Sequence, residues 1–133
     1  MPPSAERRLL QAAVATGALV PVLAGLAGIL LGPRFADSAA VADLALDSHF
    51  RYLSGLLLGV GLAFWSTVPG IERHGARFRL LTLIVVIGGL ARLGALTAGV
   101  PPIPMLAGLT MELIATPLLC LWQARVANAF HGN

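Results

Sequence analysis

Long runs of hydrophobic residues alternate with short polar or proline-rich segments along this chain. The runs predict four helices, at about residues 9–32, 49–68, 80–98 and 104–123. Each run is close to the roughly 20 predominantly apolar residues that an α-helix needs to cross a bilayer. We therefore expect an all-α integral membrane protein, an up-down four-helix transmembrane bundle that forms a single domain over residues 1–133.

The first run, Leu9–Leu31, follows Arg7 and Arg8 as the apolar part of a signal peptide would. It is longer than the about 7–15 residues usual in signal peptides, so we expect a retained transmembrane helix. Pro21 predicts a kink in this helix, because proline lacks the backbone N–H that an α-helix uses. After the fourth helix, residues 124–133 are expected to form a short tail.

The most polar connection is the loop 33–48, between the first two runs. Asp47 or Ser48 is suited to cap the second helix, because such side chains accept hydrogen bonds from free backbone N–H groups. Asp37 or Ser38 could start a short helix on the membrane surface within the loop, and a plain solvated loop is the alternative.

Arginine residues are unevenly divided between the two predicted sides of the bundle. One side carries Arg34 and Arg51, and the other carries six arginines. Cytoplasmic segments of membrane proteins are enriched in basic residues. We therefore expect a bacterial inner membrane protein with both termini and the turn Ile71–Arg79 in the cytoplasm, and the loop 33–48 in the periplasm. The six arginines on the predicted cytoplasmic side are Arg7, Arg8, Arg73, Arg77, Arg79 and Arg125.

The composition excludes most soluble functions. Hydrophobic residues make up 57% of the chain and charged residues only 11%, whereas soluble domains carry about 25% charged residues. The net charge is +3, but the basic residues lie at helix ends, where orientation and lipid headgroups explain them better than nucleic acid does. The single Cys120 excludes an internal disulfide, and no His, Asp or Glu spacing fits a metal or cofactor site.

Two charged residues, Arg92 and Glu112, lie inside the apolar runs. An ionisable group at bilayer depth is costly unless it is paired or hydrated, so both are candidate functional residues. In an up-down bundle they lie at similar depths, roughly 9 and 12 Å from the same bilayer face, and can form an ion pair. His49, Arg51 and Tyr52 start the second helix on that side. We expect these five residues to form a ligand-binding polar cluster, with one carboxylate for two arginines.

Small residues recur near these charged positions at helical spacing. Small side chains let membrane helices approach closely, so we expect the residues that carry them to form the packing faces of the bundle. The faces are Gly17, Pro21, Gly25 and Gly28 on the first helix, Gly55, Gly59 and Ala63 on the second, Gly88 and Ala95 on the third, and Gly108, Thr116 and Cys120 on the fourth.

Three motifs, at Asp47–Gly55 (DSHFRYLSG), Gly88–Arg92 (GGLAR) and Met111–Glu112, resemble the bacterial domain-of-unknown-function 4345 family over nearly the whole chain. The resemblance implies a small four-helix membrane protein without an established activity, in which the five polar cluster positions recur. The chain is more weakly similar to small four-helix scaffold proteins of sterol biosynthesis, which also carry an arginine near the start of one span and a Gly-Arg element in the next.

Several functions are compatible with this pattern. We expect a non-catalytic protein whose polar cluster binds a membrane lipid or an anionic ligand, or docks a membrane protein partner or a second copy of the chain. One alternative is a small proton-coupled transporter that acts as an oligomer and titrates Glu112. Another is a structural subunit in which Arg92 and Glu112 only fix the fold. An enzyme with His49 or Glu112 as general base has the least support, because no nucleophile or cofactor site accompanies them.

Overall fold

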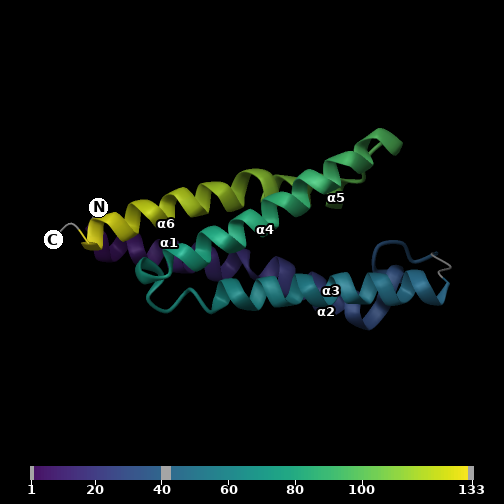
Figure 1. The fold of residues 1–133 in the computed structure, drawn as a ribbon, viewed down its shortest axis with the longest axis horizontal. Helices are drawn as coiled ribbons and strands as arrows, with labels where there is room; N and C mark the ends of the chain where they lie inside the picture. Colours follow the sequence, from purple (N-terminus) through teal and green to yellow (C-terminus); the bar gives the residue numbers. More distant parts are fainter. Residues whose placement is uncertain (1, 40–42, 132–133) are drawn as a thin grey trace. The chain divides into compact units, whose positions relative to one another are not determined.

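The computed structural model describes residues 2–39 and 43–131, and these residues contain helices and turns but no strand. The expected all-α class is therefore confirmed. The elements, shown in Figure 1, are α1 (Pro3–Gly17), α2 (Leu19–Leu31), α3 (Leu44–Trp65), α4 (Gly75–Leu93), α5 (Ile103–Thr110) and α6 (Thr116–His131), with 3-10 turns at Gly32–Phe35, Ile71–Arg73 and Gly94–Ala98 and a π-helical turn at Met111–Ala115.

The chain divides into two compact units. Unit 1 contains Met1–Gln11 and Pro69–Asn133, and unit 2 contains Ala12–Val68. Unit 1 thus holds the start of α1 together with α4, α5 and α6, whereas unit 2 holds the rest of α1 together with α2 and α3.

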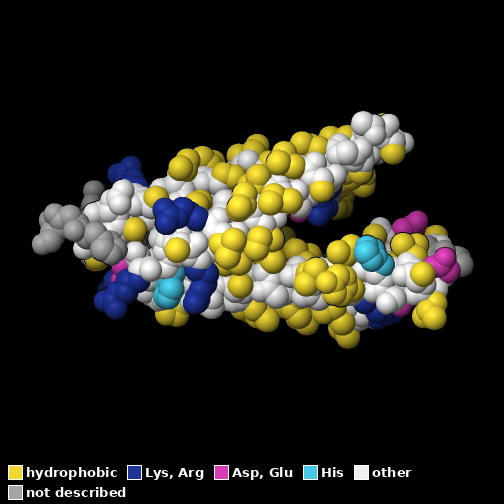
Figure 2. Space-filling view, in the orientation of Figure 1, with side chains coloured by type: hydrophobic (Ala, Val, Ile, Leu, Met, Phe, Trp, Pro, Cys, Tyr) yellow, Lys and Arg dark blue, Asp and Glu magenta, His cyan; other side chains and the backbone are white. Residues whose placement is uncertain are grey.

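Within the described residues, three helical stretches are long and apolar enough to cross a membrane: Pro3–Phe35, Gly75–Ala98 and Ile103–Phe130. They contain the first, third and fourth predicted spans, and the face seen in Figure 2 is largely hydrophobic along the helices. The second predicted span lies mostly in α3, which is not among the three. The polar residues near the start of α3, among them His49 and Arg51, reduce its apolar character.

Proline residues account for two irregularities in the helices. The break between α1 and α2 falls at Ala18, just before Pro21, which cannot donate to the carbonyl of Gly17. The predicted kink in the first helix is thus a break one turn earlier. The π-helical turn Met111–Ala115 ends directly before Thr116 and Pro117, where the backbone N–H of Thr116 reaches Met111 O. Pro117 cannot donate to the carbonyl of Leu113, so regular α-helical hydrogen bonding is interrupted at this turn.

The cap predicted for the second helix is wrong by one turn. The side chain of Asp43 accepts a hydrogen bond from the backbone N–H of Leu46 (2.8 Å), so α3 begins at Leu44 and not after Asp47 or Ser48. Leucine and alanine favour helix at the positions that follow the cap. Asp47 therefore lies inside the first turns of α3, four residues before Arg51.

The connection before α3 is only partly described. Residues Gly32–Phe35 form a 3-10 turn, and Asp37 accepts a hydrogen bond from the backbone N–H of Ala39 (2.9 Å). The short surface helix predicted for this loop falls partly on residues 40–42, which lie outside the described residues.

Two other predicted boundaries in unit 1 are also wrong. Helix α4 begins at Gly75, so the predicted polar turn Ile71–Arg79 contributes the first helical turn of α4. The predicted tail after residue 123 continues as helix α6 to His131. Packing extends this helix, because its last turns bury Val126 against the rest of unit 1. The most deeply buried side chains of unit 1 are Leu10, Ile71, Phe78, Gln123 and Val126.

In unit 2, α2 and α3 approach closely at two glycines. A Cβ atom added at Gly25 would lie 2.6 Å from the backbone N of Leu58 and 2.8 Å from the carbonyl O of Ser54. A Cβ added at Gly28 would overlap the Ser54 hydroxyl. The packing face predicted for the first helix is therefore confirmed at Gly25 and Gly28.

The face predicted for the second helix is wrong within unit 2. A Cβ added at Gly55 or Gly59 would meet nothing within 4 Å, whereas one added at Gly61 would lie 2.7 Å from the side chain of Val22. Gly17, predicted on the first helix face, also has open space around it. Helix α3 thus packs on α2 through a face that the four-residue glycine spacing does not mark.

Candidate functional site

Arg92 and Glu112 form the ion pair that the sequence predicts. Nη2 of Arg92 donates a hydrogen bond to Oε1 of Glu112 at 2.9 Å, which joins the end of α4 to the π-helical turn within unit 1. The Arg92 side chain is 43% exposed, and that of Glu112 is 18% exposed. The carboxylate is therefore largely enclosed by protein, while part of the guanidinium remains accessible.

The π-helical turn fixes the position of Glu112. Thr116 anchors the turn twice, since both its N–H and its hydroxyl donate to the carbonyl O of Met111, the hydroxyl at 2.7 Å. One such wide turn shifts the helical register, so that side chains on either side of it no longer follow one regular stripe. π-helical turns occur frequently at functional sites, and this one carries the single acidic residue of the predicted spans.

Glycine residues make room for the pair on both helices. A Cβ added at Gly108 would lie 3.4 Å from Nη1 of Arg92, so the guanidinium extends over this glycine. A Cβ added at Gly89 would lie 2.9 Å from Cβ of Glu112, which shows that α4 touches the π-helical turn there. The packing face predicted for the third helix is wrong at Gly88, because a Cβ added there would meet nothing within 4 Å.

The hydrogen-bonding capacity of the pair is only partly used. Among the described residues, Arg92 donates one side-chain hydrogen bond, although a guanidinium has five N–H groups. The second carboxylate oxygen of Glu112, Oε2, is buried and has no hydrogen-bond partner. Buried polar atoms are normally satisfied by protein or water, so this oxygen can still accept a hydrogen bond.

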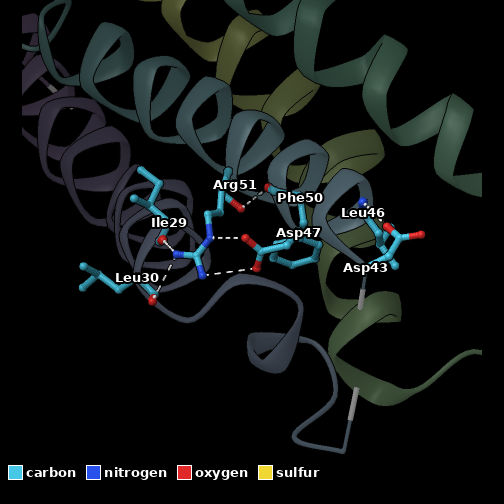
Figure 3. Close-up of polar contacts among 8 residues, drawn as sticks. Ile29, Leu30, Asp43, Leu46, Asp47, Phe50 and Arg51 are labelled. Atoms are coloured by element: carbon cyan, nitrogen blue, oxygen red, sulfur yellow. Dashed lines mark hydrogen bonds and ion pairs between the residues drawn. The ribbon is translucent and has the colours of Figure 1, made fainter. Parts of the chain in front are cut away.

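Arg51 has a different set of partners, in unit 2 (Figure 3). Its Nε donates to Oδ2 of Asp47 at 2.7 Å and its Nη2 to Oδ1 at 3.2 Å, while Nη1 bonds the carbonyls of Ile29 and Leu30 at the end of α2. The last carbonyls of a helix lack intrahelical donors and favour a positive charge. Arg51 therefore caps α2 from α3, and Asp47 holds its guanidinium in place.

Gly32 allows this cap to form. Its φ of 61° is a left-handed conformation that favours glycine. A Cβ added there would overlap Oδ1 of Asp47 and lie 3.0 Å from Nη2 of Arg51. The chain thus turns out of α2 directly beneath the ion pair.

The pKa of Asp47 lies below its ordinary value of 3.8, mainly because the carboxylate accepts hydrogen bonds from Arg51, with the arginine charge acting in the same direction. A lowered pKa makes the folded state more stable above the unfolded-state pKa, and this gain is lost as the pH falls through the folded-state value. We expect Asp47→Asn to melt below the wild type at neutral pH, and the difference to shrink below about pH 4. Thermal melting in detergent at several pH values measures it; a difference that stays constant with pH contradicts the expectation.

The predicted polar cluster divides between the two units. His49, Arg51 and Tyr52 belong to α3 in unit 2, whereas Arg92 and Glu112 belong to unit 1. His49 and Tyr52 are both exposed, and Tyr52 is 63% exposed. The Arg92–Glu112 pair is confirmed within its unit, and the association of all five residues stays a prediction.

The expected excess of positive charge in the cluster is wrong. Asp47 gives Arg51 a carboxylate of its own, as Glu112 does for Arg92. The sequence contained this signal, because Asp47 and Arg51 are spaced four residues apart, and such pairs meet on a helix. The pair was not predicted, because a helix that begins after Asp47 or Ser48 leaves Asp47 outside the helical turns that bring it next to Arg51.

A second charged site in unit 1 was not predicted. Oε1 of Glu6 lies 3.1 Å from Nε of Arg125 and accepts a hydrogen bond from Nε1 of Trp122 at 3.2 Å. Oε1 of Glu72 lies 3.5 Å from Nη1 of Arg7 and 3.9 Å from Nε of Arg73. Two of these pairs, Arg125–Glu6 and Arg7–Glu72, join residues far apart in the chain and bring together arginines that the sequence places on one side. We call the group Glu6, Arg7, Glu72, Arg73 and Arg125 the basic end of unit 1.

A comparison with protein families gives one match. The family described as domain of unknown function (DUF4345) matches residues 9–123, which include the Arg51–Asp47 pair and the Arg92–Glu112 pair. No curated protein and no solved structure matches the chain.

Proposed function

This chain belongs to the domain-of-unknown-function 4345 family, and we propose from its site that it is a non-catalytic integral membrane protein that binds the polar headgroup of a membrane lipid or a similar anionic ligand at Arg92 and Glu112. The observation that carries the proposal is the unused hydrogen-bonding capacity of this pair. Arg92 is partly accessible with most of its N–H groups unengaged, and Oε2 of Glu112 is buried without a partner.

A phosphate or carboxylate suits such a site chemically. Guanidinium groups bind these anions through two parallel N–H groups, and Arg92 uses one terminal nitrogen for Glu112. A hydroxyl or ammonium group on the same headgroup would supply the donor that Glu112 lacks. The apolar lengths of α4 and of Ile103–Phe130 leave hydrocarbon as the natural surroundings of the pair.

The proposal includes the topology of the chain. The three apolar stretches and the second predicted span, residues 49–68, cross a bacterial inner membrane as an up-down bundle, with both termini in the cytoplasm and the loop 33–48 in the periplasm. The basic end of unit 1 supports this orientation, because Arg7, Arg73 and Arg125 gather around two carboxylates near the start of α1 and the end of α6. A membrane protein partner or a second copy of the chain would contact the exposed hydrophobic faces.

Lipid that copurifies with the protein tests the proposal. We expect mass spectrometry to find less bound phospholipid on Arg92→Ala than on the wild type, with the affinity of this site reduced about 3-fold to 10-fold, because one charge-assisted interaction is worth roughly 1 kcal/mol or more. Arg34→Ala is the matched control, since Arg34 is an arginine outside both ion pairs and lies in the other unit.

Equal lipid content in Arg92→Ala and the wild type would contradict headgroup binding at this pair. It would favour the two alternatives, a structural role of the pair or a proton-coupled role of Glu112. An equal loss in Arg34→Ala would also contradict the proposal, because it would show a general effect of arginine charge.

A further inference from the structure

The basic end of unit 1 has buried carboxylates and outward arginines. The side chain of Glu72 is 9% exposed and that of Glu6 is 16% exposed, whereas those of Arg73 and Arg125 are 82% and 78% exposed. Each carboxylate therefore lies beneath an arginine that extends outward. Figure 2 shows arginine side chains near the start of α1 and the end of α6.

The ion pairs hold these two arginines by the inner part of the guanidinium. The closest nitrogen is Nε in both cases, 3.1 Å from Glu6 for Arg125 and 3.9 Å from Glu72 for Arg73. Contacts through Nε leave the two terminal amino groups, which form the fork that binds phosphate bidentately. Glu72 and Glu6 thus position the guanidinium groups of Arg73 and Arg125, and no described residue accepts a hydrogen bond from their terminal amino groups.

Arg7 completes the support beneath these forks. It joins Glu72 through Nη1 at 3.5 Å, and its guanidinium carbon lies 5.2 Å from the ring centroid of Phe130, a cation–π distance. Its Nε and Oε2 of Glu72 are buried without hydrogen-bond partners. The site therefore has unused polar atoms in its interior as well as on its surface.

We propose that the basic end of unit 1 binds the phosphate group of an anionic phospholipid, through Arg73 and Arg125 positioned by Glu72 and Glu6. A lipid fits better than a soluble anion, because unit 1 carries exposed leucines on α1, α4 and α6, and Leu121 lies one helical turn before Arg125 on α6. Leu9 is 50% exposed, Leu80 58% and Leu121 69%. Exposed apolar side chains of this kind offer an acyl chain a hydrophobic surface.

This site is separate from the Arg92–Glu112 pair. Arg73 lies directly before α4, which begins at Gly75, and Arg92 lies near its end, 17 residues or about 25 Å farther along the helix than Gly75. The two sites therefore lie toward opposite ends of α4, and loss of one leaves the other in place.

Positioning can be distinguished from simple attraction to positive charge. Glu72→Gln removes a negative charge, so simple attraction predicts tighter binding of an anionic lipid. If Glu72 positions Arg73 and Arg7, the same variant binds the lipid less tightly. Arg125→Lys and Arg73→Lys keep the charge and remove the fork.

Quenching of Trp122 by brominated lipids measures the binding. Trp65→Phe leaves Trp122, which contacts Glu6, as the single tryptophan. The protein is placed in phosphatidylcholine bilayers that contain increasing fractions of dibrominated phosphatidylglycerol. We expect about a 5-fold preference for phosphatidylglycerol over phosphatidylcholine, the size of one arginine–headgroup interaction. We expect Arg125→Lys, Arg73→Lys and Glu72→Gln each to reduce it about 2-fold or more, and Arg34→Lys to leave it unchanged.

Three results would overturn the proposal: a stronger preference in Glu72→Gln, a full preference in both lysine variants, or displacement of the lipid by millimolar inorganic phosphate. The last would show a site for a soluble anion. If Glu72→Gln does not fold, the lysine variants decide, since they retain the charges of both ion pairs.

Discussion

Gly25→Val is expected to separate α2 from α3 and to lower the free energy of unfolding by about 3 kcal/mol or more. Its first added carbon would lie 2.6 Å from the backbone N of Leu58 and 2.8 Å from the carbonyl O of Ser54. Backbone atoms cannot rotate away as side chains can, so the whole helix must move. That movement would also pull the end of α2 away from Arg51, which bonds the carbonyls there.

Gly55→Ala is the matched control for this change. Gly55 lies inside α3, and a Cβ added there would meet nothing within 4 Å. Alanine favours helix over glycine by about 0.5–1 kcal/mol, so we expect no loss of stability. Thermal or denaturant unfolding in detergent measures both variants against the wild type. Similar losses at Gly25 and Gly55 would show that the contact between α2 and α3 is not the one described above.

The contrast between these glycines shows what the sequence could predict. Hydrophobic runs predicted where the helices lie, because each run must be buried or placed in lipid whatever its neighbours are. A four-residue spacing of glycines also marks close packing, but it does not tell which neighbour fills the space. Gly25 and Gly28 do face α3, whereas Gly55 and Gly59 do not face α2. Which glycines form the contact depends on the position of the partner helix, and the spacing of residues within one helix carries no information about that position.

The ion pairs of the candidate sites also differ in how far the sequence could predict them. The Arg92–Glu112 pair could be predicted, because two charges at similar depth in adjoining apolar runs have few other partners. The Arg51–Asp47 pair was missed through an error of one helical turn at Asp43. The ion pairs of Glu6 and Glu72 with distant arginines could not be predicted, because they depend on how α1, α6 and the turn Ile71–Arg73 pack together.

Arg92→Ala is expected to reduce stability more than Glu112→Ala does, by about 2–4 kcal/mol against about 1–2 kcal/mol. Arg92→Ala leaves an unpaired carboxylate that is only 18% exposed, whereas Glu112→Ala leaves a guanidinium that is 43% exposed. Long basic side chains can extend toward polar surroundings, and a short enclosed carboxylate cannot. The double variant should lose less than the sum, with a coupling of about 1–3 kcal/mol. Denaturant unfolding of the four proteins in detergent gives these values.

Repeating the cycle with and without phospholipid separates a structural pair from a binding site. If the pair only fixes the fold, its coupling is the same in pure detergent and in detergent with phospholipid. If a headgroup binds Arg92 and Glu112, lipid should stabilise the wild type most and change the coupling, because each alanine removes part of the site. Arg92→Lys serves as the control, since it retains the charge without the fork. Coupling near zero in both conditions would mean that the 2.9 Å hydrogen bond between Arg92 and Glu112 contributes little to stability. It would also mean that Arg92 does not offset the cost of burying the Glu112 carboxylate, whose Oε2 has no partner.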